Sequence, residues 1–182
     1  MTQKSAVTLG LPPAASSAAQ VLESLPPVLS PDTRLVVLGS FPGVASLRAQ
    51  QYYAHPRNQF WPLLSALWGI DLVGLSYEMR VAEACARGLG LWDVYATCQR
   101  VGSLDSAIRD AVFNNLDSLR QQAPGLRAIA HNGAESARAM RHTRALGVAV
   151  IRLPSTSPAH ASWSFERKLA VWREAFAAHG MA

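Results

Sequence analysis

The sequence predicts an α/β fold, a three-layer α/β/α sandwich with a central, mainly parallel four-stranded sheet. The first observation is a set of short apolar runs that end at a glycine or a polar turn, as expected of strands buried on both faces of a sheet. The second is that these runs alternate with segments whose apolar residues have helical spacing. Such alternation requires right-handed crossovers between parallel strands, which place helices on both faces.

The chain begins with a segment outside this alternation. Residues 1–30 combine prolines with many Ala and Ser residues, and they predict a flexible lead with a short helix near 18–25. Residues 31–182 have the length and apolar content of a single domain with its own core, and we expect one domain there.

The strands and helices of that domain follow in order. The runs predicted to be strands are 34–39, a less regular run at 89–96, 126–133 and 148–154. The segments predicted to be helices are 60–69, 77–88, 111–125, 134–147 and 165–179. The first two helices each close at a glycine, which readily adopts the left-handed conformation that ends a helix.

Composition narrows the classes of function. The 182 residues are 49% hydrophobic, but no apolar run approaches the ~20 residues that a bilayer requires, and the N-terminus lacks a compact apolar signal segment. We therefore expect a cytoplasmic, monomeric protein without membrane contact. Two cysteines and scattered histidines predict neither a metal site nor a cofactor. The net charge of +5 favours an anionic partner, although it is equally consistent with solubility alone.

Chemistry in an open parallel sheet gathers beyond the carboxyl ends of its strands. The loops 39–58, 131–133 and 154–163 should therefore carry the site. None contains a phosphate-binding loop, a metal-binding histidine pair or the nucleophile elbow of a serine hydrolase. Outside them, Asp93 ends a predicted strand, and Asp105 is predicted to cap a helix rather than to act as an acid or base.

Three segments form an ordered set: "GSFPG" at 39–43, "HPRNQFW" at 55–61 and "LPSTSPAH" at 153–160. The set resembles the uracil-DNA glycosylase superfamily, and within it most closely the hypoxanthine-DNA (deoxyinosine) glycosylase branch. The resemblance runs from about residue 34 to the final helix. It implies an enzyme that flips a deaminated base out of damaged DNA and hydrolyses its N-glycosidic bond, leaving an abasic site without a metal or cofactor.

The resemblance also assigns residues to the site. The first motif, expected to contact the substrate, comprises Gly39, Ser40, Phe41, Pro42 and Gly43. Many members carry an Asp or Asn at the position of Phe41 to orient the attacking water. Phenylalanine cannot do this, so we expect the task to pass to Asn58, whose amide can accept from water and donate to the base. The alternative for Asn58 is a brace within the loop.

Further roles follow from the same resemblance. Tyr53 is expected to stack on the flipped base, and Asn132 to bond the base edge, unless it only forms an Asn-Gly turn. Ser155 occupies the position of a leaving-base stabiliser, with His160 as its support. Ser157 is expected to contact a phosphate, and residues 158–160 to fill the vacated stack. The slot is expected to work without any carboxylate.

Three alternatives remain open. The first is a uracil or mismatch-specific glycosylase. The second is a protein that binds damaged bases without cutting, since Phe41 and Ser155 replace groups that the chemistry usually needs. The third is a small-molecule hydrolase, which would bind its substrate with little dependence on salt.

Overall fold

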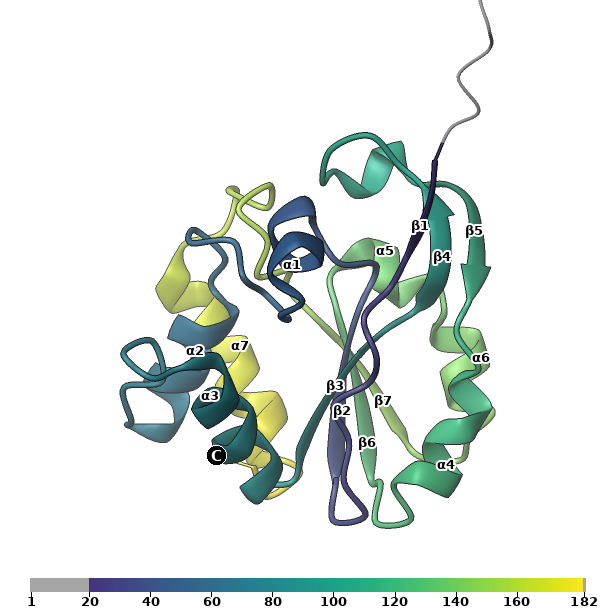
Figure 1. Ribbon diagram of the computed structural model, residues 1–182. Helices are drawn as coiled ribbons and strands as arrows, with labels where there is room; N and C mark the ends of the chain where they lie inside the picture. The colour runs from purple at the N-terminus through teal and green to yellow at the C-terminus, as the bar shows by residue number, and fades with distance from the viewer. Residues whose placement is uncertain (1–19, 182) are drawn as a thin grey trace, which may run out of the picture.

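The computed structural model describes residues 20–181 and arranges them in three layers (Figure 1). The central sheet has the order β3-β2-β6-β7, and all its neighbouring strands are parallel. The strands are β2 (Leu35–Gly39), β3 (Leu89–Asp93), β6 (Ala128–Asn132) and β7 (Ala149–Leu153). The predicted α/β sandwich around a four-stranded parallel sheet is therefore confirmed.

Helices cover both faces of this sheet (Figure 1). On one side lie α2 (Phe60–Trp68), α3 (Tyr77–Ala86) and α7 (Phe165–Ala177). On the other lie α4 (Leu119–Gln122), α5 (Ala134–Ala137) and α6 (Met140–Arg144). Strand β2 shows why its sequence is continuously apolar: Leu35 and Val37 belong to one buried cluster, whereas Val36 and Leu38 belong to the other.

The helix predicted over 134–147 is interrupted between α5 and α6, and buried polar contacts account for its position there. Ser136 donates to the Leu38 carbonyl at 2.7 Å, and the ring of His131 lies 2.9 Å from the hydroxyls of both Ser136 and Thr143. These bonds tie each half of the segment separately to the sheet.

A second, three-stranded antiparallel sheet was not predicted. It has the order β1-β4-β5, with β1 (Val21–Glu23), β4 (Tyr95–Gln99) and β5 (Arg109–Phe113). The run predicted as one strand at 89–96 therefore divides at Val94 between the two sheets. The helix predicted over 111–125 is wrong for most of its length. Residues 111–113 belong to β5, the turn η2 (Leu116–Ser118) follows, and only the short α4 is α-helical.

The predicted lead is also corrected where the structure describes it. Residues 21–23, expected to be helical, form β1 and pair with β4, because backbone pairing satisfies their amides at the sheet edge. Leu25 is buried in the core, and Val28 bridges Leu91. Residues 20–30 therefore pack on the domain, whereas residues 1–19 lie outside the described range.

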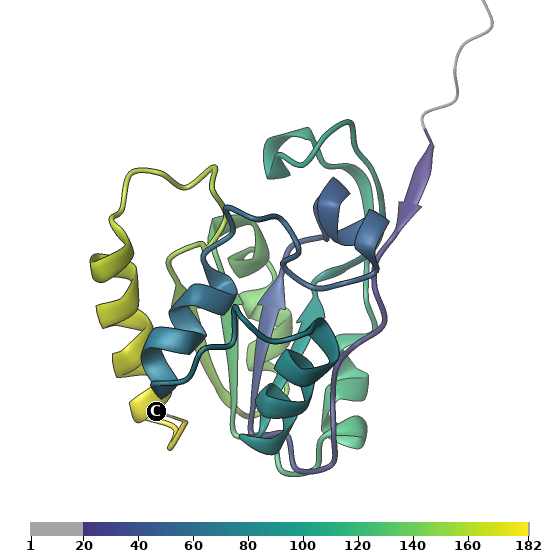
Figure 2. The ribbon, with the colours of Figure 1, turned by 60° about the vertical axis from the view of Figure 1, so that its left-hand side comes forward.

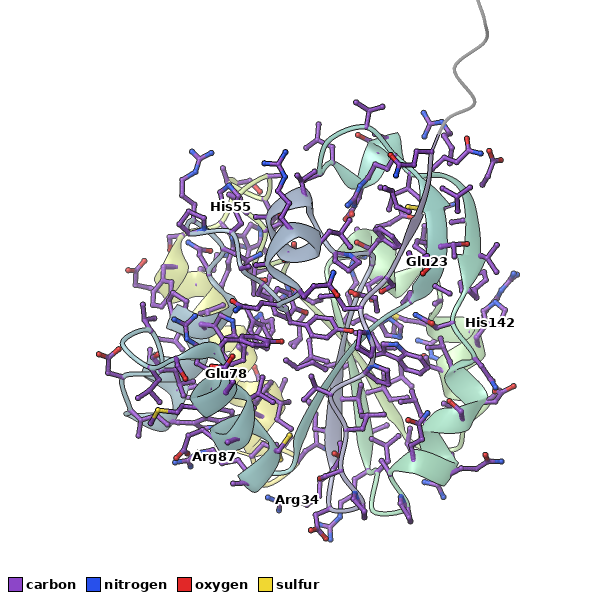
Figure 3. The ribbon with its side chains drawn as sticks, in the orientation of Figure 1. Glu23, Arg34, His55, Glu78, Arg87 and His142 are labelled. Atoms are coloured by element: carbon purple, nitrogen blue, oxygen red, sulfur yellow. The ribbon has the colours of Figure 1, made fainter. Side chains whose placement is uncertain are left out.

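The carboxyl ends of the parallel strands meet at one end of the molecule. Figure 2 shows α1 (Val44–Ala49) and the loop before α7 at this same end. In Figure 3, His55 lies at this end and Arg34 at the opposite one. No helix within residues 20–181 is long and apolar enough to cross a membrane.

Candidate active site

A cavity lies beyond the carboxyl ends of three neighbouring strands. Gly39, Asp93 and Asn132 are the last residues of β2, β3 and β6, and all three line it. Every predicted site residue except His160 lines the same cavity, namely Gly39, Ser40, Phe41, Pro42, Gly43, Tyr53, Asn58, Asn132, Ser155 and Ser157. Segments far apart in the chain thus converge on one site.

His160 lies elsewhere. It lines a neighbouring cavity with Arg152 and Trp163, and only Ser155 borders both cavities. Its backbone carbonyl accepts a hydrogen bond of 2.8 Å from the buried Lys168 ammonium, which fixes this part of the loop to α7. The geometry therefore does not support the prediction that His160 assists at the base.

The first motif is held by the loop that follows β4. Ser40 donates to a carboxylate oxygen of Asp105 at 2.6 Å, and the hydroxyl of Ser103 accepts from the amide of Val44 at 2.9 Å. The prediction that Asp105 caps a helix is wrong: the short turn η1 (Asp105–Ala107) follows Leu104 and has no side-chain cap. Asp105 instead lines the cavity.

Phe41 belongs to a buried apolar cluster and is only 6% exposed. The Arg100 guanidinium lies 5.1 Å from the centre of its ring and also donates to the Pro42 carbonyl. The side chain at this position therefore packs and offers no group that could hold a water molecule, as expected from the sequence.

Tyr53 has one ring face occupied. Its ring stacks on Phe60 with 3.8 Å between centres, so that a base could stack only on the opposite face. Its hydroxyl accepts a hydrogen bond of 3.3 Å from the Asn132 amide. Burial raises the pKa of the Tyr53 phenol well above its usual value, and the phenol therefore stays neutral.

Asn58 braces its loop and keeps hydrogen-bonding capacity for a ligand, while its predicted role toward water stays a prediction. Its side-chain oxygen accepts from the amide of Phe60 at 2.9 Å, which braces the start of α2. Its side-chain nitrogen makes no hydrogen bond to any residue of the described range. The oxygen retains a second lone pair, so both atoms have capacity for a ligand or water.

Asn132 ties β6 to the loop after β7. Its nitrogen donates to the Thr156 hydroxyl at 2.9 Å, and its oxygen accepts from the Thr156 amide at 3.0 Å. The following Gly133 has a φ of 104°, and a side chain there would approach Ser155 to 2.9 Å. Asn132 thus positions Tyr53 and the loop, in addition to bordering the cavity.

The two serines of the last loop have local partners. The Ser155 hydroxyl accepts from the Ser157 amide, and the Ser157 hydroxyl accepts from the Ala159 amide, each at 3.2 Å. Accepting these bonds leaves both hydroxyl hydrogens available as donors. Their predicted roles toward the base and a phosphate stay predictions.

Asp93 is the residue that sequence reasoning missed. It is 3% exposed, lines the cavity and accepts a hydrogen bond of 3.1 Å from Ser24. Burial raises its pKa to about 7, against the lowering effects of Ser24 and Arg100. The prediction of a slot without carboxylates is therefore wrong, since Asp93 and Asp105 both line it. The available signal was an aspartate ending an otherwise apolar strand.

The contact between Gly39 and Asp93 predicts an asymmetry within the first motif. A methyl group added at Gly39 would lie 2.3 Å from Asp93 Oδ1, whereas one at Gly43 would meet Ser103 only at 3.3 Å. Gly39→Ala should therefore lower the free energy of unfolding by ~1–3 kcal/mol, and Gly43→Ala by much less. Urea denaturation of both variants measures this, and equal losses would contradict it.

Comparisons with known proteins identify the family of this chain. The sequence model of the uracil DNA glycosylase superfamily matches residues 26–177. Two relatives are named hypoxanthine DNA glycosylase. The one from Methanosarcina barkeri is 36% identical over 85% of this chain and 97% of its own length, and the one from Methanosarcina acetivorans is 35% identical over 86% and 98%.

A solved structure is similar as well. The solution NMR structure of a Methanosarcina acetivorans protein, described as a candidate uracil DNA glycosylase, has a TM-score of 0.76 and 34% sequence identity to this chain. The similarity covers 85% of this chain and 98% of that one. On the matching family model and on these relatives, the chain belongs to the uracil-DNA glycosylase superfamily.

Proposed function

We propose that this chain is a DNA glycosylase that hydrolyses the N-glycosidic bond of deoxyinosine in damaged DNA, releases hypoxanthine and leaves an abasic site. The observation that supports this best is the convergence of Tyr53, Asn58, Asn132 and Ser155 on one cavity at the carboxyl end of the sheet. The relatives named hypoxanthine DNA glycosylase favour this substrate over uracil.

The chemistry needs few groups. A neutral base departs with the electron pair of the bond, so negative charge develops on the base and positive charge on the sugar while a water attacks. Asn58 holds the water through its side-chain oxygen, and Ser155 donates toward the departing base. Tyr53 offers its remaining ring face to the flipped base. The site requires no metal or cofactor for these steps.

The surroundings of the cavity suit duplex DNA. Arg48 on α1 and Arg57 beside Asn58 are exposed and make no ion pair within residues 20–181. With the net charge of +5, they favour contact with phosphates, which would make binding weaken as salt rises. We propose further that the protein acts as a monomer in the cytoplasm.

The test is a cleavage assay on matched duplexes that contain inosine, uracil, xanthine or a mismatched thymine. We expect base release and an alkali-sensitive abasic site with inosine, unchanged by a metal chelator. A clear preference for uracil would move the proposal to a uracil glycosylase. Tight binding to inosine DNA without any base release would favour a damage-binding protein instead.

A loop on the rim of the cavity yields a further prediction. Val101 and Leu104 are 92% and 57% exposed, and they flank Ser103, which lines the cavity. Apolar side chains at such a place can wedge into a base step from which a nucleotide has been flipped. Replacing both with Ser should lower excision from duplex DNA about tenfold, with little change on single strands.

Val112 supplies the control for this experiment. It is a 58% exposed valine on β5 and does not line the cavity, so Val112→Ser should leave both substrates unaffected. Equal losses on single-stranded and duplex DNA in the double variant would assign the loop to support of the cavity and contradict the wedge.

A further inference from the structure

We propose that Asp93 reads the flipped base as a neutral carboxylic acid, donating a hydrogen bond to O6 of hypoxanthine and accepting one from N1–H. The inference rests on the proposed function and assigns the base-reading group of the same cavity. It differs from the sequence-based expectation, in which no carboxyl group contacted the base.

Asp93 lies deep in the cavity, and we therefore expect it to contact the flipped base rather than the sugar. The sugar of a flipped nucleotide stays joined to the DNA strand, so it remains near the mouth while the base enters first. Asp93 is 3% exposed at the end of a central strand, whereas Asn58 and Ser157 are only half-buried. A group at that depth meets the far edge of the base.

The carboxyl of Asp93 lies in the wall of the cavity and packs against the backbone of Gly39. Oδ2 accepts from Ser24, while Oδ1 lies beside Gly39, where a Cβ would sit 2.3 Å away. The glycine therefore makes room for this oxygen at the junction of β2 and β3. The nearest aromatic hydroxyl is that of Tyr53, 3.6 Å from the same point and engaged with Asn132.

The charges around Asp93 leave it able to hold a proton near neutral pH. Arg100, at the end of β4, lowers its pKa, whereas Asp105, in η1, raises it. Tyr52 and Tyr53 also face it and stay neutral, because burial raises the pKa of both phenols. No cation within residues 20–181 lies within 4.0 Å of its carboxylate, so burial dominates and the pKa is raised to about 7.

A neutral acid matches hypoxanthine where a carboxylate does not. Hypoxanthine presents an acceptor, O6, next to a donor, N1–H, and a carboxylic acid presents one donor next to one acceptor. An ionised carboxylate has acceptors only and would face O6 with like charge. As the base leaves, negative charge grows on it, and a neutral donor at O6 stabilises that charge.

The rival role for Asp93 is general base toward the attacking water, and it has the opposite pH dependence. A base must be ionised, so excision would rise through pH 7. A reader must be protonated, so excision should fall as pH rises through 7. The sign of the pH profile therefore separates the two roles.

The experiment measures single-turnover excision from inosine duplexes between pH 5.5 and 8.5 for wild type, Asp93→Asn and Asp93→Leu. We expect wild type to lose about tenfold between pH 7 and 8.5. Asp93→Asn retains a donor and an acceptor, so its excision rate should stay within about tenfold of the wild-type rate. Because the amide does not titrate, this rate should no longer decrease as pH rises through 7. Asp93→Leu should lose at least about 100-fold.

Asp105→Asn is the matched control in the same cavity. In Asp105→Asn the excision rate should still decrease with rising pH, as in wild type. The decrease should occur at lower pH, since Asp105 raises the pKa of Asp93. A wild-type rate that climbs through pH 7, together with an inactive Asp93→Asn that melts like wild type, would overturn the proposal. Absence of excision by wild type at every pH would instead refute the proposed function.

Discussion

Asn58→Ala is expected to lower single-turnover excision of hypoxanthine by about 100- to 1000-fold, the usual loss when one preorganised polar group is removed from a catalytic site. Phe41 stands where the family resemblance implies a water-orienting Asp or Asn, and it packs in the core beside Arg100. Asn58 is therefore the amide on the rim that remains for this task.

The brace formed by Asn58 complicates a simple deletion. Its oxygen also accepts from the Phe60 amide, so Ala removes a contact at the start of α2 worth ~0.5–1.5 kcal/mol of stability. Asn58→Asp keeps an acceptor for both Phe60 and water, and it replaces the amide donor with a second acceptor that carries negative charge. If Asn58 positions the water, the excision rate of Asn58→Asp should stay within about tenfold of the wild-type rate.

The measurements are single-turnover rates with enzyme in excess, inosine-duplex affinity and thermal melting for both variants. Unchanged affinity with a lost rate assigns Asn58 to the chemical step. Wild-type rates in Asn58→Ala, or a loss in Asn58→Asp as large as in Ala, would contradict water positioning through the oxygen.

The sequence predicted the central sheet because β2 is buried on both faces and continuously apolar, and β6 begins with a buried apolar run. It did not predict β1 or β5, because these strands are short, partly exposed and stabilised by partners on β4. Pairing of this kind depends on tertiary context rather than on local pattern.

The residues of the candidate site also fall into those that the sequence predicted and those that it did not. Tyr53, Asn58 and Asn132 were predicted because the segments around them resemble those of the uracil-DNA glycosylase superfamily. Asp93 and Asp105 were not assigned to it, since their place depends on register: Asp93 pairs with Gly39 across two strands, and Asp105 reaches Ser40 from a loop 65 residues away. The local sequence shows Asp93 as an aspartate at the end of an apolar strand, but it does not show the pairing with Gly39 or the contact between Asp105 and Ser40.

The pH dependence of the free energy of unfolding should reveal whether Asp93 is protonated in the folded protein, without any DNA present. The folded-state pKa of Asp93 is raised from 3.8 to about 7, so between these values the native state holds a proton that the unfolded chain releases. Unfolding is then favoured as pH rises, and the contribution of Asp93 to stability falls from pH 4 to 7 and levels off above.

His131 opposes this trend. Burial lowers its pKa from 6.5 to about 4, so the unfolded chain binds a proton that the native state excludes, and its contribution to stability rises over that range. The contributions of Asp93 and His131 therefore have opposite signs between pH 4 and 6.5. Only a difference between variants isolates Asp93.

Asp93→Asn provides that difference. The amide cannot ionise, yet its oxygen can accept from Ser24 as the carboxylate does. Between pH 5 and 8, the free energy of unfolding of Asp93→Asn should gain about 3 kcal/mol relative to wild type, since each pKa unit is worth about 1.4 kcal/mol. Urea denaturation at several pH values measures this gain. If the difference in free energy of unfolding between Asp93→Asn and wild type stays constant with pH, Asp93 is ionised in the folded protein. That result would contradict the proposal of a neutral acid in the cavity.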